Sequence, residues 1–152
     1  MLQGYKADGV TEIAKEDLLY IDADFLIPAA LEGQITADNA DRVKAKYIVE
    51  GANGPTSYEA DQILNAKGKI VVPDILANAG GVIVSYFEWV QNLQSLSWSL
   101  EEVNNKLADI LLKAFDEVYG LTEERGYPMR TSAYIIALRR LVKTKKIRGI
   151  FP

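Results

Sequence analysis

Three short apolar runs stand out in the first half of the chain, separated by polar segments of similar length. They begin at Asp24 (DFLIP), Tyr47 (YIV) and Ile70 (IVV), and their starts are evenly spaced. The spacing accommodates a strand, a loop, a helix of about three turns and a return loop. Because the runs are rich in Ile and Val, they are typical of parallel strands buried on both faces. The pattern predicts a parallel sheet built from strand–loop–helix units.

The polar segments between these runs carry helix start and stop signals. Thr36 can cap a helix through ADNADRVK. Thr56 and Glu59, three residues apart, form a potential capping box for YEADQILNAK, and Gly68 is placed to end that helix. We therefore expect one helix between each pair of successive strands.

Helical periodicity dominates the second half of the chain. Residues 78–93 are apolar on most faces, which predicts a largely buried helix. Ser99 and Glu102 form another capping box, which opens a long amphipathic helix that ends at Gly126. A last helix is predicted over residues 130–146, with an apolar stripe that comprises Tyr134, Ile135, Leu138, Leu141 and Val142.

These elements predict an α/β fold, namely a partial Rossmann-like parallel sheet of about three strands followed by long C-terminal helices. We interpret residues 1–152 as a single partial dinucleotide-binding domain, with strand–loop–helix units over about 1–77 and helices over about 78–152. A complete dinucleotide-binding fold has two such halves, and one of them carries a glycine-rich phosphate loop. No GxGxxG or Walker A motif occurs in the sequence. We therefore expect the phosphate-binding half to be missing.

The composition excludes several classes of chemistry. The chain has 152 residues, of which 49% are hydrophobic and 25% charged, as in an ordinary single soluble domain. It contains neither Cys nor His, so thiol and histidine catalysis and Cys- or His-ligated metal sites are excluded. The net charge of -4 argues against nucleic acid as a partner. No apolar run is long enough to span a membrane, and the start MLQGYKADG does not resemble a signal peptide, so we expect a cytoplasmic protein.

The loops that follow the three predicted strands are the place to look for a ligand. Parallel strands bring their carboxyl ends to one edge of a sheet, and ligands of open α/β sheets bind along that edge. Ala29 and Ala30 would let a flat ring approach the backbone, and the amides of Asn53 and Asn78 suit a carboxamide or a ribose. Each feature taken alone is more often structural. The pattern by itself leaves a nucleotide site and purely structural roles both open.

Four blocks of the sequence resemble the glutamate dehydrogenase family. They are LIPAALEGQIT (26–36), GANGPT followed by Glu59–Asp61, PDILANAGGVIVSYFEWVQN (73–92) and RTSAYIIALRRL (130–141). The resemblance covers about residues 10–152 and implies an enzyme that interconverts L-glutamate with 2-oxoglutarate and ammonia, using NAD or NADP.

The resemblance also implies roles for particular residues. The implied cofactor contacts are Ala29, Ala30, Asn53 and Asn78. The implied substrate contacts are Val82 and Ser85, and the hydroxyl of Ser85 would meet the side-chain carboxylate of glutamate. One helical turn separates Val82 from Ser85, so both can face the same cleft.

The chain departs from the family in what it lacks. In the family, the catalytic lysine and aspartate lie in an N-terminal domain that nothing here matches. We therefore assign no catalytic residue, and we expect a fragment that is inactive alone, from an enzyme that is a homo-oligomer at full length. Two alternatives are a non-catalytic binding or assembly module, and a fragment of a related branched-chain or aromatic amino-acid dehydrogenase. The second is less favoured because Ser85 suits an acidic side chain better than an apolar one.

Overall fold

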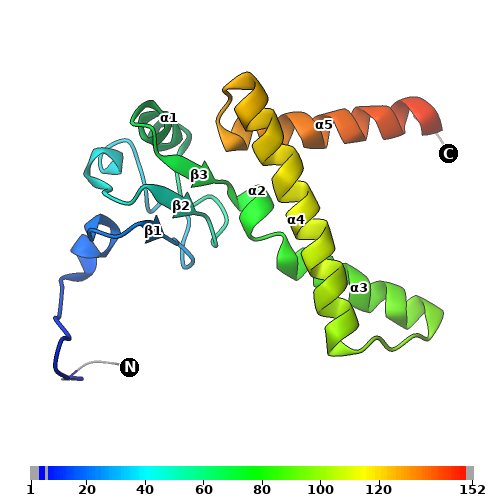
Figure 1. The fold of residues 1–152 in the computed structure, drawn as a ribbon, viewed down its shortest axis with the longest axis horizontal. Coiled ribbons are helices and arrows are strands. Elements are labelled where there is room, and N and C mark those ends of the chain that lie inside the picture. Colours follow the sequence, from blue (N-terminus) through cyan, green and yellow to red (C-terminus); the bar gives the residue numbers. More distant parts are fainter. Residues whose placement is uncertain (1–3, 6, 150–152) are drawn as a thin grey trace.

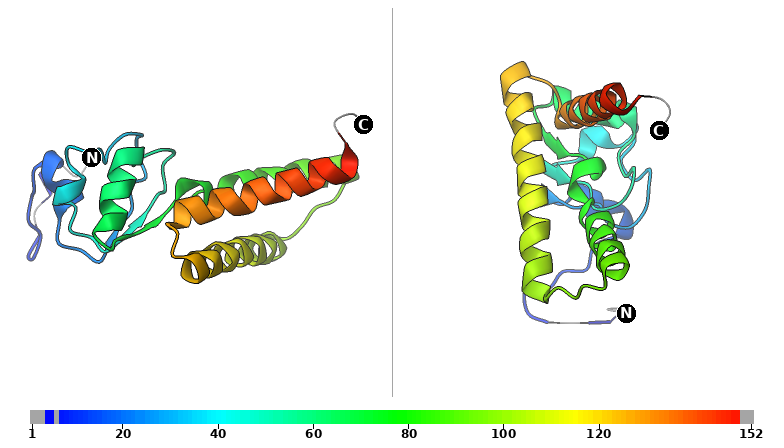
Figure 2. Two further views of the ribbon diagram at one scale, coloured as in Figure 1. Left: turned by 90° about the horizontal axis from the view of Figure 1, so that it is seen from above. Right: turned by 90° about the vertical axis from the view of Figure 1, so that its right-hand side faces the viewer.

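The computed structural model describes residues 4–5 and 7–149, so the two ends of the predicted domain, residues 1–3 and 150–152, lie outside the described part. The sheet lies at one end of the molecule, and three long helices extend away from it (Figures 1 and 2). In chain order the elements are η1 (Lys15–Tyr20), β1 (Phe25–Leu26), η2 (Ala40–Arg42), β2 (Tyr47–Val49), α1 (Tyr58–Ala66), β3 (Ile70–Val72), α2 (Asp74–Ala77), α3 (Gly80–Gln94), α4 (Leu100–Arg125) and α5 (Met129–Arg148).

The three strands form a parallel sheet in the order β1-β2-β3, which confirms the predicted fold class. β2 and β3 coincide with the predicted runs, and Ile48 of β2 pairs with Val71 of β3. β1 is shorter than the predicted run and contains only Phe25 and Leu26. Pro28 follows closely, and because proline has no backbone N–H it cannot continue the ladder as a donor. Its carbonyl still accepts a hydrogen bond from the N–H of Ala52 at 2.9 Å.

One face of the sheet packs against α1 and the segment before β2 and is buried along β2 and β3. Ile48 and Val71 point into this side, where they join Leu64 of α1 and Ile35 in the main apolar core. Because strand side chains alternate between faces, the neighbouring residues of the same strands point to the opposite side. There a smaller core, made of Leu76, Val118, Met129 and Ala133, covers part of the sheet.

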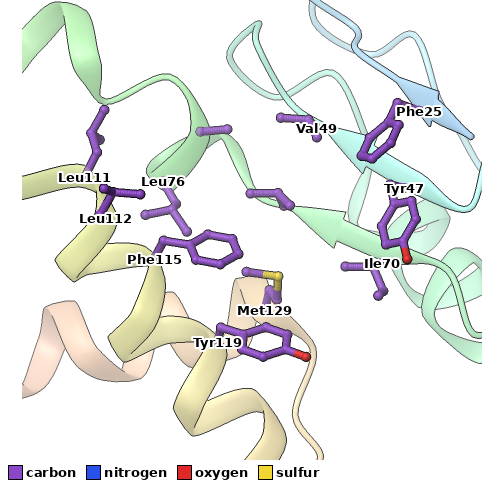
Figure 3. Close-up of a pocket in the computed structure, with 12 residues that line it drawn as sticks. Phe25, Tyr47, Val49, Ile70, Leu76, Leu111, Leu112, Phe115, Tyr119 and Met129 are labelled. Carbon is purple, nitrogen blue, oxygen red and sulfur yellow. The ribbon is translucent and has the colours of Figure 1, made fainter. Parts of the chain in front are cut away.

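The second face of the sheet is only half-buried, so the prediction that the strands are buried on both faces is wrong for this face. A cavity of about 590 Å³ separates the strands from α4. Figure 3 shows Phe25, Tyr47 and Ile70 on one side of it, and Phe115 and Tyr119 of α4 on the other. The rings of Phe25 and Tyr47 stack with their centroids 4.9 Å apart. The helices reach β3 but leave β1 uncovered, and Phe25 is therefore exposed.

Two predicted helix starts in the first half are corrected by the structure. Ser57, not Thr56, caps α1, and its side chain accepts from the N–H of Ala60 at 3.2 Å. Thr56 is instead buried in a parallel bridge with Ile35, and its hydroxyl has no hydrogen-bond partner among the described residues. Thr36 opens no regular helix, since only the short η2 forms, and the side chain of Asn39 accepts from the N–H of Thr36.

The long helices begin and end close to where their signals predict. Ser99 and Glu102 form the predicted capping box at the start of α4, and Gly126 ends that helix with a φ of 68°. α5 extends over Met129–Arg148, slightly longer than predicted. Its buried side chains are those of Met129, Ser132 and Ala133 rather than the predicted stripe. Four residues of that stripe are exposed, namely Tyr134, Leu138, Leu141 and Val142.

The helix at residues 78–93 differs most from its prediction. α2 occupies Asp74–Ala77, and α3 begins only at Gly80. Phe87 is the buried residue of α3, whereas Val82 is 76% exposed and Leu93 67% exposed. Among the described elements, α4 is the one that packs substantially along α3, so a helix that is apolar on most faces has only one side covered. The prediction of a largely buried helix is wrong for this reason.

Candidate functional site

The carboxyl ends of the strands and the start of α3 line an open, solvent-facing pocket of about 840 Å³. Each strand contributes a loop to it, as the parallel topology requires. The pocket is lined by Ala30, Leu31, Glu32, Gly51, Ala52, Asn53, Asn78, Gly81, Val82 and Ser85. All of the predicted site residues except Ala29 are therefore brought together at one edge of the sheet. Their roles as cofactor or substrate contacts remain predictions.

Ala29 does not line the pocket, but it lies against Gly51, which does. A Cβ atom placed on Gly51 would lie 3.1 Å from the Cβ of Ala29, which is closer than ordinary contact. The loops after β1 and β2 are also joined by backbone hydrogen bonds, among them one from Gly33 N–H to the carbonyl of Gly54 at 2.9 Å. The small side chain of Ala29 and the absence of one at Gly51 let these two loops lie side by side.

The two predicted asparagines form a pair. The amide nitrogen Nδ2 of Asn78 donates a hydrogen bond to Oδ1 of Asn53 at 2.6 Å. The remaining amide group of Asn53 and the side-chain oxygen of Asn78 have no hydrogen-bond partner among the described residues. The pair therefore offers both donors and an acceptor to a ligand, which is the combination that a carboxamide or a ribose requires.

Val82 and Ser85 bring the first turns of α3 to the same pocket. Both side chains are exposed, and they stand one helical turn apart. A serine inside a helix often bonds back to a carbonyl of the preceding turn. No such bond from Ser85 occurs in the part of the chain that the structure describes, so its hydroxyl remains free to donate to a ligand.

Next to the loop that carries Asn53 lies a buried cluster of charges that was not predicted from the sequence. It consists of Glu50, Asp61, Asp74 and Arg130. The guanidinium of Arg130 lies 2.6 Å from Glu50, 3.3 Å from Asp61 and 3.3 Å from Asp74. Glu50 and Asp61 are almost completely buried, and the Arg130 side chain is 18% exposed. The features of the sequence that could have indicated this cluster are a single glutamate directly after an apolar strand and a single arginine at the start of a helix.

The cluster contains three carboxylates and one cation, and the pKa values reflect this imbalance. Burial raises the pKa of Asp61 above the ordinary value of 3.8, although the charge and hydrogen bond of Arg130 partly oppose the shift. Burial acts to lower the pKa of Arg130, but the hydrogen bond to Glu50 and the charges of all three carboxylates outweigh it, so this pKa is raised. The arginine therefore stays protonated, and Asp61 is the carboxyl whose ionised form the fold disfavours.

This shift predicts how Asp61→Asn should change stability with pH. Because the folded-state pKa of Asp61 is raised, the native state holds this proton more tightly, and the stabilisation is lost as pH rises through the raised pKa. Asparagine resembles the protonated acid and does not titrate. We expect the unfolding free energy of the variant minus that of the parent to increase as the pH rises from the ordinary pKa of 3.8 through the raised pKa of Asp61.

Urea denaturation followed by circular dichroism at several pH values measures this difference. Asp109→Asn, on the exposed side of α4, is the matched control and should give a difference that changes little with pH. If the difference in unfolding free energy for Asp61→Asn also changes little with pH, then the pKa of Asp61 is not raised in the folded state.

Two further classes of site are not found in the described residues. No group of three or more His, Cys, Asp and Glu side chains there is arranged to hold a metal ion. Among the described residues, none of the helices combines the length and the apolar character that crossing a membrane requires.

Sequence comparisons identify relatives over nearly the whole chain. A sequence model described as Glutamate/Leucine/Phenylalanine/Valine dehydrogenase matches residues 1–149. The glutamate dehydrogenase of Thermotoga maritima is 57% identical over 140 residues, which are 92% of this chain and 34% of that protein. The NAD-specific glutamate dehydrogenase of Staphylococcus aureus is 52% identical over 90% of this chain and 33% of its own length. The chain thus spans about a third of the length of these relatives.

Solved structures give the same result. The hetero-hexameric glutamate dehydrogenase of Thermus thermophilus in its Leu-bound form matches with a TM-score of 0.87 and 35% identity, over 99% of this chain and 36% of that chain. The glutamate dehydrogenase of Peptoniphilus asaccharolyticus matches with a TM-score of 0.76 and 40% identity, over 82% of this chain and 32% of that chain. An L-tryptophan dehydrogenase from Nostoc punctiforme, at 24% identity and a TM-score of 0.74, shares the fold.

Proposed function

The chain belongs to the glutamate/leucine/phenylalanine/valine dehydrogenase family, and on that premise we propose that it forms part of the cofactor and substrate site of a glutamate dehydrogenase. The proposed reaction is the NAD- or NADP-dependent oxidation of L-glutamate to 2-oxoglutarate and ammonia, and its reverse. The observation that carries the proposal is the pocket in which the Asn53–Asn78 amide pair faces the same space as Ser85.

The residues at the strand edge fit a nicotinamide nucleotide. The proposed cofactor contacts are Ala29, Ala30, Asn53 and Asn78. The amide pair offers donors and an acceptor side by side, and at Gly51 and Ala29 no large side chain stands between a ligand and the backbone. When bound, the nicotinamide ring would accept a hydride from the substrate. Relatives specific for NAD and for NADP are both known, in Staphylococcus aureus and Synechocystis respectively, and both are consistent with these contacts.

The proposed substrate contacts are Val82 and Ser85 at the start of α3. The Ser85 hydroxyl would donate a hydrogen bond to the side-chain carboxylate of glutamate, and Val82 would pack against the methylene groups. A free hydroxyl at this position favours an acidic amino acid over leucine, valine or phenylalanine, because an apolar side chain would leave the hydroxyl without a partner. Glutamate is therefore favoured over the other substrates of the family.

We assign no catalytic residue, and we propose that the chain alone has no turnover. Hydride transfer needs two positioned reactants and a group that moves a proton, and the pocket supplies part of one wall. The proposal treats residues 1–152 as one partial dinucleotide-binding unit of an oligomeric cytoplasmic enzyme. The Thermus relative is a hetero-hexamer, which supports an oligomer but does not favour a homo-oligomer. A non-catalytic assembly role remains the alternative for the isolated chain.

A chimera tests the proposed function. The chain replaces the matching third of the Thermotoga maritima enzyme, and NAD(P)H formation is measured with glutamate, leucine, valine and phenylalanine as substrates. We expect the chimera to prefer glutamate and the chain alone to produce no NAD(P)H. Ser85→Ala in the chimera should raise the KM for glutamate by about 10–100-fold, since a hydrogen bond to a charged group contributes about 1.5–3 kcal/mol.

Ser97→Ala is the matched control, because Ser97 is exposed in the loop between α3 and α4 and does not line the pocket. A chimera that prefers an apolar amino acid, or a Ser85→Ala variant with an unchanged KM for glutamate, would refute the substrate assignment. Robust turnover by the isolated chain would refute the claim that it lacks the catalytic machinery.

A further inference from the structure

The side chain of Asp74 connects the buried charge cluster to the loop that carries Asn53. Asp74 is the first residue of α2 and lies between the loop that carries Asn53 and the residue Asn78. We propose that Asp74, held in place by Glu50 and Arg130, is a positioning residue that fixes Asn53 and Asn78 at hydrogen-bond distance. The role of the Asn53–Asn78 pair in binding a cofactor rests on the proposed function, whereas the positioning of the pair by Asp74 does not.

Asp74 contacts both asparagine-bearing segments. Its side-chain oxygen Oδ2 accepts a hydrogen bond from the N–H of Gly54, the residue directly after Asn53, at 2.8 Å. Its backbone carbonyl accepts from the N–H of Asn78 at 3.1 Å. The backbone bond is the ordinary helical bond at the end of α2, so the side chain of Asp74 ties the loop that carries Asn53 to the helix whose end carries Asn78.

The cluster leaves Asp74 little freedom to move. Its backbone N–H donates to Oε2 of Glu50 at 2.8 Å, and its Oδ1 accepts from Arg130 at 3.3 Å. The other oxygen of Glu50 pairs with Arg130 at 2.6 Å, so Glu50 and Arg130 hold Asp74 from both its backbone and its side chain. Asp61, on α1, contacts the guanidinium as well and fixes its orientation. Residues of α1, α2 and α5, together with Glu50 directly after β2, thereby meet at one guanidinium.

A purely stabilising ion pair would not need the contact to Gly54. That residue is exposed, has a φ of 56°, and a side chain added to it would meet open space, so the bond to Asp74 contributes little to burial or packing. The loop is already joined to the loop after β1 through the carbonyl of Gly54, and the bond to Asp74 adds its attachment to the start of α2. The loop is also the segment whose displacement would separate the two amides.

Nuclear magnetic resonance of the ¹⁵N-labelled chain tests this assignment without any ligand, so its outcome is independent of the proposed reaction. The readouts are the side-chain amide signal of Asn78, hydrogen exchange at the Gly54 N–H, and exchange at the buried Ile48 and Leu64 N–H groups. Asn53→Ala provides the reference for an Asn78 amide that has lost its partner. Asp74→Ala is the test variant, and Asp109→Ala on the exposed side of α4 is its control.

In Asp74→Ala, we expect the Asn78 amide signal to move to the position seen in Asn53→Ala. Exchange at Gly54 should accelerate by about tenfold or more, while exchange at Ile48 and Leu64 changes much less. Asp109→Ala should leave every readout unchanged. Asp74→Asn, which keeps an acceptor oxygen without the charge, should give an intermediate signal, and it decides the matter if the alanine variant does not fold.

Three results would overturn the assignment. The first is an Asn78 signal in Asp74→Ala that coincides with that of the parent chain. The second is a uniform rise in exchange that includes Ile48 and Leu64, because Asp74 would then stabilise the whole fold rather than position the loop. The third is an Asn78 signal that does not respond to Asn53→Ala, because the amide pair would then not exist in solution.

Discussion

Arg130→Met should lower the free energy of unfolding by about 3–5 kcal/mol, the cost of leaving a buried charge without its partner. The side chains of Glu50 and Asp61 are 0% and 3% exposed, and both face the guanidinium. Methionine fills much of the same volume but donates no hydrogen bond, so three carboxylates would face one another without a cation. Urea denaturation followed by far-ultraviolet circular dichroism measures the loss.

Two other variants make this prediction specific. Arg125→Met removes an exposed arginine that pairs with Glu124 at 3.1 Å, and it should cost less than about 1 kcal/mol. Arg130→Lys keeps the charge but not the planar fork that contacts three carboxylates at once, so its cost should lie between those of the two methionine variants. Equal losses for Arg125→Met and Arg130→Met would show that the cluster is not held by its cation.

Ile48→Ala is expected to lower the free energy of unfolding by about 2–5 kcal/mol. Ile48 is 0% exposed in the middle strand and lies in the main core between the sheet and α1. Truncating it removes apolar contacts and leaves a void that the neighbouring strands, fixed by their pairing, can close only in part. The same strand leads into the loop that carries Asn53, so the site depends on this packing.

Ile147→Ala is the matched control for Ile48→Ala. Ile147 is 76% exposed near the end of α5, and its truncation should change the unfolding free energy by less than about 0.5 kcal/mol. The same urea series applies to both variants. Losses of similar size at the two positions would mean that the core does not lie where the structure places it.

Local signals were sufficient for the strands and the long helices. β2 and β3 are short runs of β-branched and aromatic residues, and α4 has a capping box at one end and a glycine at the other. The choice between Thr56 and Ser57 as the cap of α1 was not a local matter, because both side chains can cap a helix. The parallel bridge between Ile35 and Thr56 decided it, and that bridge joins residues far apart in the chain.

The burial of α3 was mispredicted because hydrophobicity measures what a helix could bury, not what is present to cover it. The sequence pattern predicts core positions for Val82, Trp89 and Leu93, yet these side chains are exposed. The prediction of a helix was therefore correct, but the prediction that other elements cover most of its faces was wrong.

The location of the candidate site could be predicted from the sequence, but the contacts between its side chains could not. The topology of parallel strands alone brings Asn53 and Asn78 to one edge, as the sequence indicated. The hydrogen bond between them depends on side-chain orientation, and the charge cluster joins Glu50 to Arg130, which lie 80 positions apart in the chain. A pattern of apolar and polar residues cannot predict this ion pair, because each partner is an isolated charge in its own segment.

The strand registers limit where this chain can change in length. Tyr47 pairs with Ile70 and Val49 with Val72, so β2 and β3 leave the sheet at the same level. Deleting one residue from the turn around Gly68 would shift the register of β3 by one position relative to β2. Val71 would then point away from the core, and Asn78 would no longer lie opposite Asn53. The connection between α3 and α4 contributes to no strand. Natural insertions and deletions should therefore accumulate at residues 95–98 and be rare between β2 and β3.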